Sequence, residues 1–555
     1  MAAFVVAVEM TGVPAVRAAP GPVVATAPGT VVGPLVAGDQ GIGADEEAEA
    51  DSVVAAFSDD DGVHDWIGFY RWSSGVYEVH AKRGSVGFQR EWDGAGYTYP
   101  IVFSAGENPF ANTDPQQAWV DDDATATLSE RARPYPYERL SALFDSPDAP
   151  DLAVEPHWRN DTSEATHSRM EGHSSRALLV VSGPGFNHEG VVDRHAKQVD
   201  LAPTLAELVG APLVDGTYKG QPATGVHVKW QDGDPLDDLL DGTRPDRTLL
   251  VTWDQGFTPL VLDMFDKGEL PNLRSLVDTG TMYRYGLVAN YPSDTLPSNS
   301  VLATGAWSGH TGVTGNHIYD RAGDFVWDPV EPEWFAVSDL YTSPAVETLF
   351  EVAKRSFPAA WTVSADSPMH RGADTASARL LNVGYRAKRA TTPLQKLDVF
   401  FGFLRDIPVL DPRGLAVPIV DLRCDPPKDS LLSNVVDGLA TASVAGQFPW
   451  TRAVSTSPRG LLPRFLWLYQ TRTDEIGHRS RFDDACLRRA YRDADSRLGI
   501  ALAELDAAGV RDRTAVVVTS DHGRAETGYD VPLASILDTV PGLDYVQAGY
   551  FVYLR

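Results

Sequence analysis

Cysteine is nearly absent from this 555-residue sequence, which contains only Cys424 and Cys486. Two cysteines cannot build a disulfide framework, and their spacing indicates no cysteine-based zinc site. Pairing between the two stays open, but we interpret them as two buried thiols.

The sequence also lacks an apolar run long enough to span a bilayer. Residues 1–6 are apolar, but no basic segment precedes them, and Glu9 interrupts the apolar stretch soon afterwards. We therefore predict no membrane span and no signal peptide, which favours a cytoplasmic location.

Positive charge is scarce, since Lys and Arg total 47 against 76 Asp and Glu, for a net charge of −29. Such a charge repels nucleic acid backbones and anionic membranes at long range. We expect no binding to nucleic acid duplexes, and these features carry no prediction of oligomeric state. The hydrophobic fraction of 43% is typical of a globular protein with a large core.

Composition divides the chain into two patterned parts. Residues 1–61 are a low-complexity acidic leader that we predict to be disordered, apart from a short helix near Asp51–Phe57. Residues 62–230 and 247–555 carry regular apolar patterns. The polar, turn-rich stretch 231–246 between them is interpreted as a linker.

Short apolar runs alternate with helical patterns in both parts. Strands buried on both faces are predicted at 177–182, 248–253, 464–469 and 514–519. Helices are predicted at 135–144, 199–210 and 483–508, and a strand pair at 67–72 and 76–80. This alternation predicts an α/β fold with a mostly parallel central sheet, whose ligands gather at the carboxyl ends of the strands.

Acidic and imidazole side chains follow three of these strands. Asp254 comes directly after the first strand of the second part, Asp474 and His478 follow the next, and Asp521 and His522 follow the last. Imidazole nitrogen and carboxylate oxygen together suit zinc. Taken singly, each residue also has a structural interpretation, such as a turn, a helix cap or an interior histidine.

A hydroxyl residue, Thr295, stands just before an expected helix start. Helix N-termini favour anions such as phosphate, and a metal-activated hydroxyl there can attack phosphorus. Capping the helix is the commoner use of threonine at such a place, so that alternative stays open.

Taken in order, these segments resemble the alkaline phosphatase superfamily, and most of all its type I phosphodiesterase/nucleotide pyrophosphatase branch. The resemblance covers most of residues 248–525. It rests on the aspartate after the first strand, a T-x-P-N-type segment ending in T-G, and the G-x-x-G-N, D-x-x-G-H and S-D-H-G motifs at 312–316, 474–478 and 520–523. It implies a three-layer α/β/α sandwich and a phosphoric ester hydrolase acting on phosphodiester or pyrophosphate bonds, including those of nucleotides.

One family element is out of place. The family needs a late histidine after S-D-H-G, but no histidine follows Gly523. The T-H-S, G-P-G-F and D-x-x-P-T-L segments that normally come last are found instead at 166–168, 183–186 and 200–205. The resemblance therefore implies a circular permutation, with residues 62–230 supplying the late part of the domain and 247–555 the early part.

Under this interpretation the strand at 550–554 is expected to lie beside 67–72. A fragment of a tandem duplication, in which His167 serves a site in another copy, is the rival interpretation. We favour permutation because the two parts together make one complete set without duplicates.

The resemblance also implies the roles of the site residues. It assigns two divalent ions, most simply zinc, to two ligand sets: Asp254, Thr295, Asp521 and His522 for one, and Asp474, His478 and His167 for the other. Two metals roughly 4 Å apart clamp the attacking and leaving oxygens of a phosphoryl transfer. Thr295 would form the covalent intermediate with a small phosphate ester, and Asn299 would hold a non-bridging oxygen.

Several alternatives stay open. His173 is a second candidate for the seventh ligand, whereas His310 and His317 are left out of the metal shell. The nucleophile segment reads T-L-P-S-N where relatives read T-F-P-N-H, and Gln255 stands where they often have glycine. These departures leave open a phosphomonoesterase, a phosphonate hydrolase, a phosphomutase and a non-catalytic binding protein. Residues 86–160 and 319–463 are expected to build much of the pocket.

Overall fold

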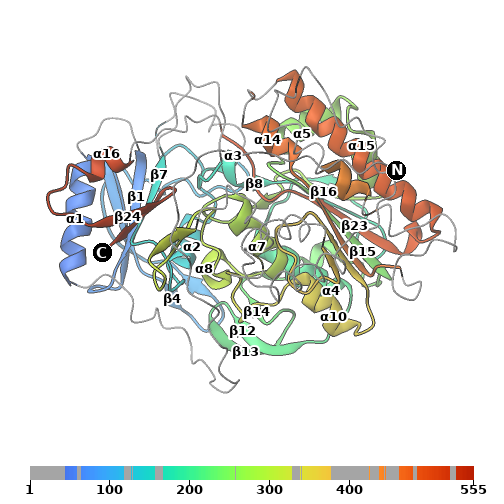
Figure 1. Cartoon of the computed structure of the whole chain (residues 1–555), viewed down its shortest axis with the longest axis horizontal. Coiled ribbons are helices and arrows are strands. Elements are labelled where there is room, and N and C mark those ends of the chain that lie inside the picture. Colours follow the sequence, from blue (N-terminus) through green and yellow to red (C-terminus); the bar gives the residue numbers. More distant parts are fainter. Residues whose placement is uncertain are drawn as a thin grey trace, which may run out of the picture.

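The computed structural model describes residues 44–58, 64–117, 127, 129–156, 167–256, 258–327, 338, 341–376, 424, 437–442, 444, 462–478, 480, 484–525 and 533–555. These residues form a mixed α/β structure built on two large sheets (Figure 1). Residues 1–43 of the expected leader, and most of 377–463, lie outside the described residues. None of the helices in the described part combines the length and apolar composition that a bilayer crossing requires.

The larger sheet has eight strands. Their order is β10 (Gly190–Val192), β16 (Gly280–Tyr283), β9 (Leu179–Ser182), β23 (Thr514–Thr519), β15 (Arg247–Trp253), β22 (Phe465–Gln470), β20 (Thr362–Ala365) and β21 (Thr375–Ala376). Strand β9 pairs antiparallel with both of its neighbours, and all other neighbouring pairs in this sheet are parallel. The carboxyl ends of β23, β15 and β22 therefore meet at one edge.

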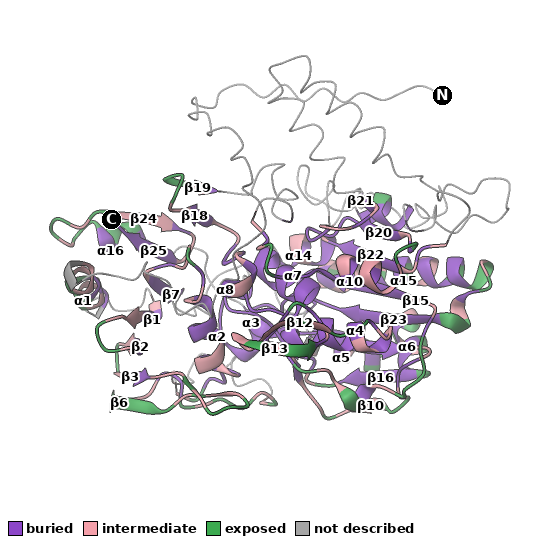
Figure 2. Ribbon diagram, turned by 90° about the horizontal axis from the view of Figure 1, so that it is seen from below, coloured by how far each residue is buried: buried purple, intermediate pink, exposed green. Residues whose placement is uncertain are grey.

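Helices cover both faces of this sheet. Leu249 and Val251 of β15 pack in a core with α5 (Thr258–Asp266), α6 (Pro271–Val277) and α15 (Ala485–Ala507). Leu250, on the opposite face, packs with α4 (Leu201–Leu208), α7 (Thr295–Thr304) and α10 (Leu349–Ser356). Because successive side chains of a strand point to opposite faces, a continuous apolar run packs into the cores on both sides of the sheet. Figure 2 shows the resulting burial of the central strands and of α7.

The second sheet has seven strands. Their order is β24 (Tyr545–Ala548), β25 (Phe551–Leu554), β7 (Leu152–Pro156), β1 (His64–Arg71), β2 (Val76–Ala81), β3 (Gly84–Phe88) and β6 (Ile101–Gly106). The antiparallel pair β1–β2 confirms the predicted strand pair. The prediction that 550–554 lies beside 67–72 is wrong, because β7 pairs with both β25 and β1 and so separates them. The red and blue strands in Figure 1 thus share one sheet without touching directly.

Part of the expected disordered leader is ordered. Ala44–Ser58 forms helix α1, which is longer than the short helix predicted near Asp51–Phe57. Ala50, Val53 and Phe57 recur at helical spacing and are buried against Phe69 of β1. Val54 and Ala56 of α1 are partly buried against the same cluster. Composition missed this packing face because the first half of the helix is acidic.

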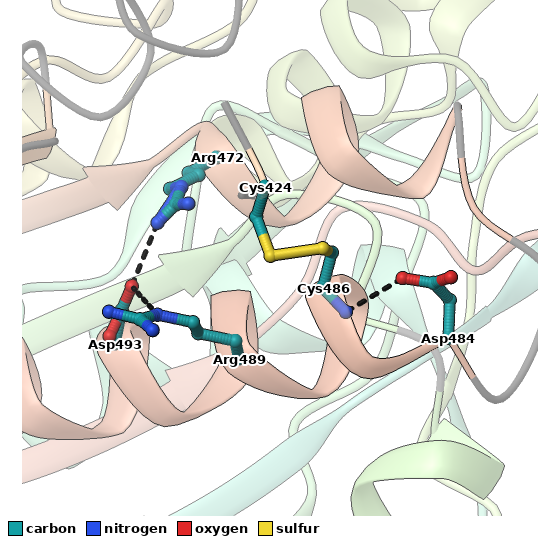
Figure 3. Close-up of a disulfide and its surroundings, with 6 residues drawn as sticks. All are labelled: Cys424, Arg472, Asp484, Cys486, Arg489 and Asp493. Carbon is teal, nitrogen blue, oxygen red and sulfur yellow. Dashed lines mark hydrogen bonds and ion pairs between the residues drawn. A yellow bond between two sulfur atoms is a disulfide. The ribbon is translucent and has the colours of Figure 1, made fainter. Parts of the chain in front are cut away.

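The two cysteines form a disulfide, so the interpretation as two buried thiols is wrong. Cys424 and Cys486 are joined with a Cα–Cα distance of 5.3 Å (Figure 3). Cys486 lies in the first turn of α15, where its backbone N–H donates to the N-cap residue Asp484. A separation of 62 residues carried no signal in the sequence, since pairing depends on folded proximity.

The predicted linker 231–246 packs on the core. Asp232 is buried and accepts hydrogen bonds from the backbone N–H of Trp307 at 2.7 Å and from Nε1 of Trp230 at 3.1 Å. Leu239 is fully buried. Turn-rich composition therefore indicated the absence of long elements here, but not the absence of tertiary contacts.

Candidate metal centre and nucleophile

Three neighbouring strands deliver three carboxylates to one place. Asp254 follows β15, Asp521 follows β23, and Asp474 lies in α14 (Arg472–Gly477), one turn beyond β22. Register places Trp253 opposite Gln470 and Thr252 opposite Thr519, so the three strands end side by side. The parallel pairing is thus the reason that Asp254 shares one site with two carboxylates that lie far from it in sequence.

His522 lies where the ligand groups meet. Its Nε2 is 3.6 Å from Oδ1 of Asp254, 3.7 Å from Oδ2 of Asp521 and 3.2 Å from Oγ1 of Thr295. Its other ring nitrogen, Nδ1, is 2.9 Å from the carbonyl oxygen of Gly523, which can only accept a hydrogen bond. Nδ1 therefore carries the proton, and the lone pair of Nε2 faces the carboxylates.

His167, from the first part of the chain, lies beside the same carboxylates. Its Nε2 is 3.8 Å from Oδ1 of Asp474, and its ring centroid is 4.0 Å from that of His522. His478 lies close as well, with Nε2 3.2 Å from Oδ2 of Asp474 and a ring centroid 5.1 Å from that of His167. His173 is buried in the short helix α3 (Gly172–Ser175). Neither His173 nor His478 belongs to the two groups of candidate ligands among the described residues, but His478 contacts Asp474.

The segment that carries His167 is held against the S-D-H-G motif. The backbone N–H of Gly523 donates to the carbonyl of Ser174, and that of Arg524 to the carbonyl of His173. A Cβ atom at position 523 would lie 2.0 Å from the carbonyl oxygen of His173. The glycine of the motif is therefore required by this close backbone approach.

Thr295 is the first residue of α7 and not its N-cap, a position that Asp294 occupies. The Thr295 side chain is buried, and His522 is the partner of its hydroxyl. The alternative in which Thr295 caps the helix does not hold. Its hydroxyl instead faces the candidate metal ligands at the positive end of a ten-residue helix.

Crowding of carboxylates gives the site a strong negative potential. Burial and then the neighbouring charges of Asp521 and Asp474 raise the pKa of Asp254 well above its ordinary value. Burial also raises the pKa of Asp474, but the adjacent His478 and His167 outweigh this and lower it below the usual range. Placing such groups together without compensation is costly, so the geometry favours a bound cation.

The residues fit a pair of divalent ions. Two groups of described residues bring their ligand atoms within 4.8 Å of one another: His167, Asp474 and His522 in one, and Asp254, Asp521 and His522 in the other. Oδ1 of Asp254 and Oδ1 of Asp474 are buried without a hydrogen-bond partner. Buried polar atoms are rarely left unsatisfied, so these two oxygens are candidate ligand positions.

A family model decides the classification. Residues 248–555 match the model of type I phosphodiesterase / nucleotide pyrophosphatase, which is more than half of the chain. The chain belongs to this family. Its members are phosphoric ester hydrolases. The resemblance inferred from the motifs is thereby confirmed.

Two solved structures are similar over part of the chain. Murine ectonucleotide pyrophosphatase / phosphodiesterase 5 has 14% sequence identity and a TM-score of 0.30, covering 50% of this chain and 57% of the other. Phosphonoacetate hydrolase from Sinorhizobium meliloti, in complex with phosphonoformate, has 19% identity and a TM-score of 0.30, covering 56% and 60%. Both alignments therefore cover less than two thirds of the solved chains. A comparison with curated proteins found no match.

Asn299 is placed differently from the expectation. Its Nδ2 donates to the carbonyl of Thr295 at 2.8 Å and to Oδ2 of Asp521 at 2.9 Å. It also lies 3.2 Å from the hydroxyl of Tyr469, which in turn contacts Asp254 and Asp521. The amide therefore binds Asp521 directly, and its N–H groups already have acceptors within the protein.

Asn316, which the sequence interpretation missed, is placed beside the nucleophile. Its Oδ1 accepts a hydrogen bond from the backbone N–H of Leu296 at 2.9 Å, which fixes the amide next to Thr295. Asn316 also lines the cavity described below. The signal was present as the last residue of the G-x-x-G-N motif, but no role was assigned to it.

Asp294, also missed, faces His167. Its Oδ1 is 2.9 Å from Nδ1 of His167 and accepts a hydrogen bond from the hydroxyl of Ser168. Burial raises the pKa of the Asp294 carboxyl, but the contacts with His167 and Ser168 outweigh it and lower the pKa below its usual value. No motif marks this residue.

A cavity of about 300 Å³ opens next to the site. Its described lining consists of His167, Ser168, Tyr291, Pro292, Asp294, Gly315, Asn316, His317, Leu533 and Gln547–Phe551. None of these residues lies in 86–160 or 319–463, the segments expected to build the pocket. The described part of the wall includes the turn between β24 and β25, which the second sheet brings to the site. Most of 377–463 lies outside the described residues, so a contribution from that segment stays a prediction.

Proposed function

We propose that this protein is a metal-dependent hydrolase of phosphodiester or pyrophosphate bonds, including those of nucleotides, that works through a covalent threonine intermediate. The observation that carries the proposal is the position of Thr295. Its Oγ1 lies 3.2 Å from Nε2 of His522, the one side chain shared by both candidate ligand groups. Membership of the phosphodiesterase family supports the same reaction class.

The proposed roles follow from this arrangement. Asp254, Thr295, Asp521 and His522 hold one zinc, and Asp474, His478 and His167 hold the other. When bound, the two ions supply positive charge that stabilises the attacking and leaving oxygens. Mixed imidazole and carboxylate donors favour zinc over magnesium or calcium, which take oxygen ligands.

Thr295 attacks phosphorus and displaces the leaving alcohol or phosphate in line, forming a phosphate ester on its Oγ1. A water molecule entering from the side of His167 and Asp474 then hydrolyses this ester and restores the hydroxyl. Asn316 replaces Asn299 as the residue proposed to hold a non-bridging oxygen. Its Oδ1 is committed to Leu296, which leaves the donor end of the amide for the substrate.

We also infer that the order of segments is a circular permutation of the family domain. The support is that β9, from the first part, lies between β16 and β23 of the second part in one sheet. The late-type histidine, His167, lies 3.8 Å from Asp474 within the same chain. A duplicated domain with His167 in another copy would not require this contact.

The proposed function is tested by turnover of two aryl substrates. Bis(4-nitrophenyl) phosphate, a diester, is expected to be hydrolysed faster than 4-nitrophenyl phosphate, a monoester, and both rates are expected to fall on chelation and return with zinc. A faster monoester rate would support the phosphomonoesterase alternative. A chain that binds no zinc and turns over neither substrate would support a non-catalytic binding protein.

A further inference from the structure

Asp294 stands at the N-cap of α7 but does not cap the helix. Aspartate is among the preferred N-cap residues because its carboxylate accepts hydrogen bonds from the first backbone N–H groups. Here the side chain makes no such bond. The N–H of Leu296 is satisfied instead by Asn316. The carboxylate of Asp294 is therefore directed elsewhere.

The carboxylate is directed to His167. Nδ1 of His167 is 2.9 Å from Oδ1 of Asp294, which also accepts the hydroxyl hydrogen bond of Ser168. Because an ionised carboxylate only accepts, Nδ1 carries the proton, and the lone pair of Nε2 is left to face Asp474. Both partners are buried, with exposures of 4% for His167 and 8% for Asp294.

Hydrogen bonds of the neighbouring residues join the segment around His167 to the segment around Asp294. The N–H of Ser168 donates to the carbonyl of Ser293 at 3.2 Å, and the hydroxyl of Ser293 donates to the carbonyl of Arg169 at 2.7 Å. Oγ of Ser174 is 2.8 Å from Oγ of Ser293. The residue next to the nucleophile and the histidine 127 residues earlier are thus tied together on both sides.

We propose that Asp294 is a positioning residue that fixes the ring of His167 with Nε2 toward Asp474 and so sets the zinc affinity of the position that these two residues form. This inference rests on the proposed two-zinc function. Carboxylates that hold the remote nitrogen of a metal-binding histidine orient the ring and increase its basicity. Asp294 also joins the nucleophile segment directly to a ligand supplied by the other part of the chain.

The test measures zinc affinity rather than activity. Zinc-free full-length protein is titrated against a chromophoric chelator to give two stepwise dissociation constants for the wild type, Asp294→Ala and Asp294→Asn. We expect Asp294→Ala to raise one of the two zinc dissociation constants by about 10- to 100-fold and to leave the other within about threefold of its wild-type value. Asp294→Asn keeps an acceptor oxygen, so its affected dissociation constant is expected to lie between those of the wild type and of Asp294→Ala.

Asp232→Ala is the matched control. Asp232 is also a buried aspartate in contact with a histidine, since Oδ2 lies 2.6 Å from Nδ1 of the partly buried His310, but it lies in neither group of candidate ligands among the described residues. Both zinc constants are expected to stay at the wild-type values. Circular dichroism of the zinc-free proteins checks that each variant is folded, and Asp294→Asn carries the test where Asp294→Ala does not fold.

The positioning role would be overturned if both zinc dissociation constants were unchanged in both Asp294 variants. It would also be overturned if both constants rose equally in a folded variant. Failure of the proposed function has a different signature, because the wild-type chain itself would then bind fewer than two zinc ions.

Discussion

His522 connects two sets of ligands that come from different parts of the chain. Asp254 and Asp521 approach its Nε2 from the strand ends of the second part, and the ring of His167 packs against it from the first part. Thr295 completes the group with its hydroxyl. The chemistry of the site therefore depends on a few side chains that the two parts of the chain bring together.

Replacement of Thr295 by alanine tests the nucleophile directly. The variant is expected to lose at least about 1,000-fold in kcat for a phosphodiester, because the covalent step has no substitute group. Zinc content is expected to stay near the wild-type value, since the carboxylate and imidazole ligands remain. Steady-state turnover and elemental analysis of the same preparation measure both. Diester turnover close to that of the wild type would rule out Thr295 as the nucleophile.

Residues that stand in motifs could be proposed as ligands from the sequence alone, because their order along the chain is local information. Asp474 with His478, and Asp521 with His522, are of this kind. Asp294 was out of reach because its role depends on a histidine 127 residues away. Asn299 was predicted to face the substrate, whereas its amide donates to the carbonyl of Thr295 and to Asp521, which spacing along the chain cannot show.

Among the secondary-structure elements, α8 (Ser308–Thr311) carries a partly buried histidine that contacts two carboxylates. His310 lies between Asp232, 2.6 Å from its Nδ1, and Asp145, 2.9 Å from its Nε2. Burial lowers the pKa of His310, but the two carboxylates outweigh it and raise the pKa to about 10. A histidine held in the charged form in this way ties the predicted linker to the segment after α2 (Pro136–Leu143).

The stability that His310 provides is expected to depend on pH. Its folded pKa lies above the unfolded value of about 6.5, so the contribution is complete below that pH and is lost as pH rises through about 10. His310→Gln is expected to lower the free energy of unfolding by about 3 kcal/mol at pH 6 and by less at pH 9.5. Urea unfolding of both proteins at the two pH values measures this. An equal or larger loss at pH 9.5 would contradict the assignment.

The disulfide is expected to stabilise the fold. Cys424–Cys486 closes a loop of 62 residues onto the start of α15. A closed loop of that length stabilises the fold by about 4 kcal/mol in the chain-entropy model. Cys424→Ser with Cys486→Ser is expected to lower the free energy of unfolding by about 2–4 kcal/mol in urea. A thiol assay on the unreduced, denatured wild type should find no free thiol, and two thiols per chain would contradict the bond.

At the scale of the molecule, the two large sheets each contain strands from both parts of the chain, and four smaller sheets accompany them in the described residues. In the larger sheet β9 lies among strands of the second part, and in the smaller one β24 and β25 join strands of the first. Alternation of strands and helices predicted the α/β class because it is a pattern along the chain. The pairing of β25 with β7, and the pocket wall from Gln547–Phe551, depend on packing between distant segments and were not predictable.

We propose that side chains from both parts of this polypeptide hold one pair of zinc ions beside Thr295. Anomalous diffraction at the zinc edge, from crystals of the zinc-loaded full-length protein, tests it most directly. We predict two peaks, one bounded by Asp254, Asp521 and His522 and one bounded by Asp474, His478 and His167. A single peak, or a second peak with no atom of His167 in its coordination sphere, would contradict the account.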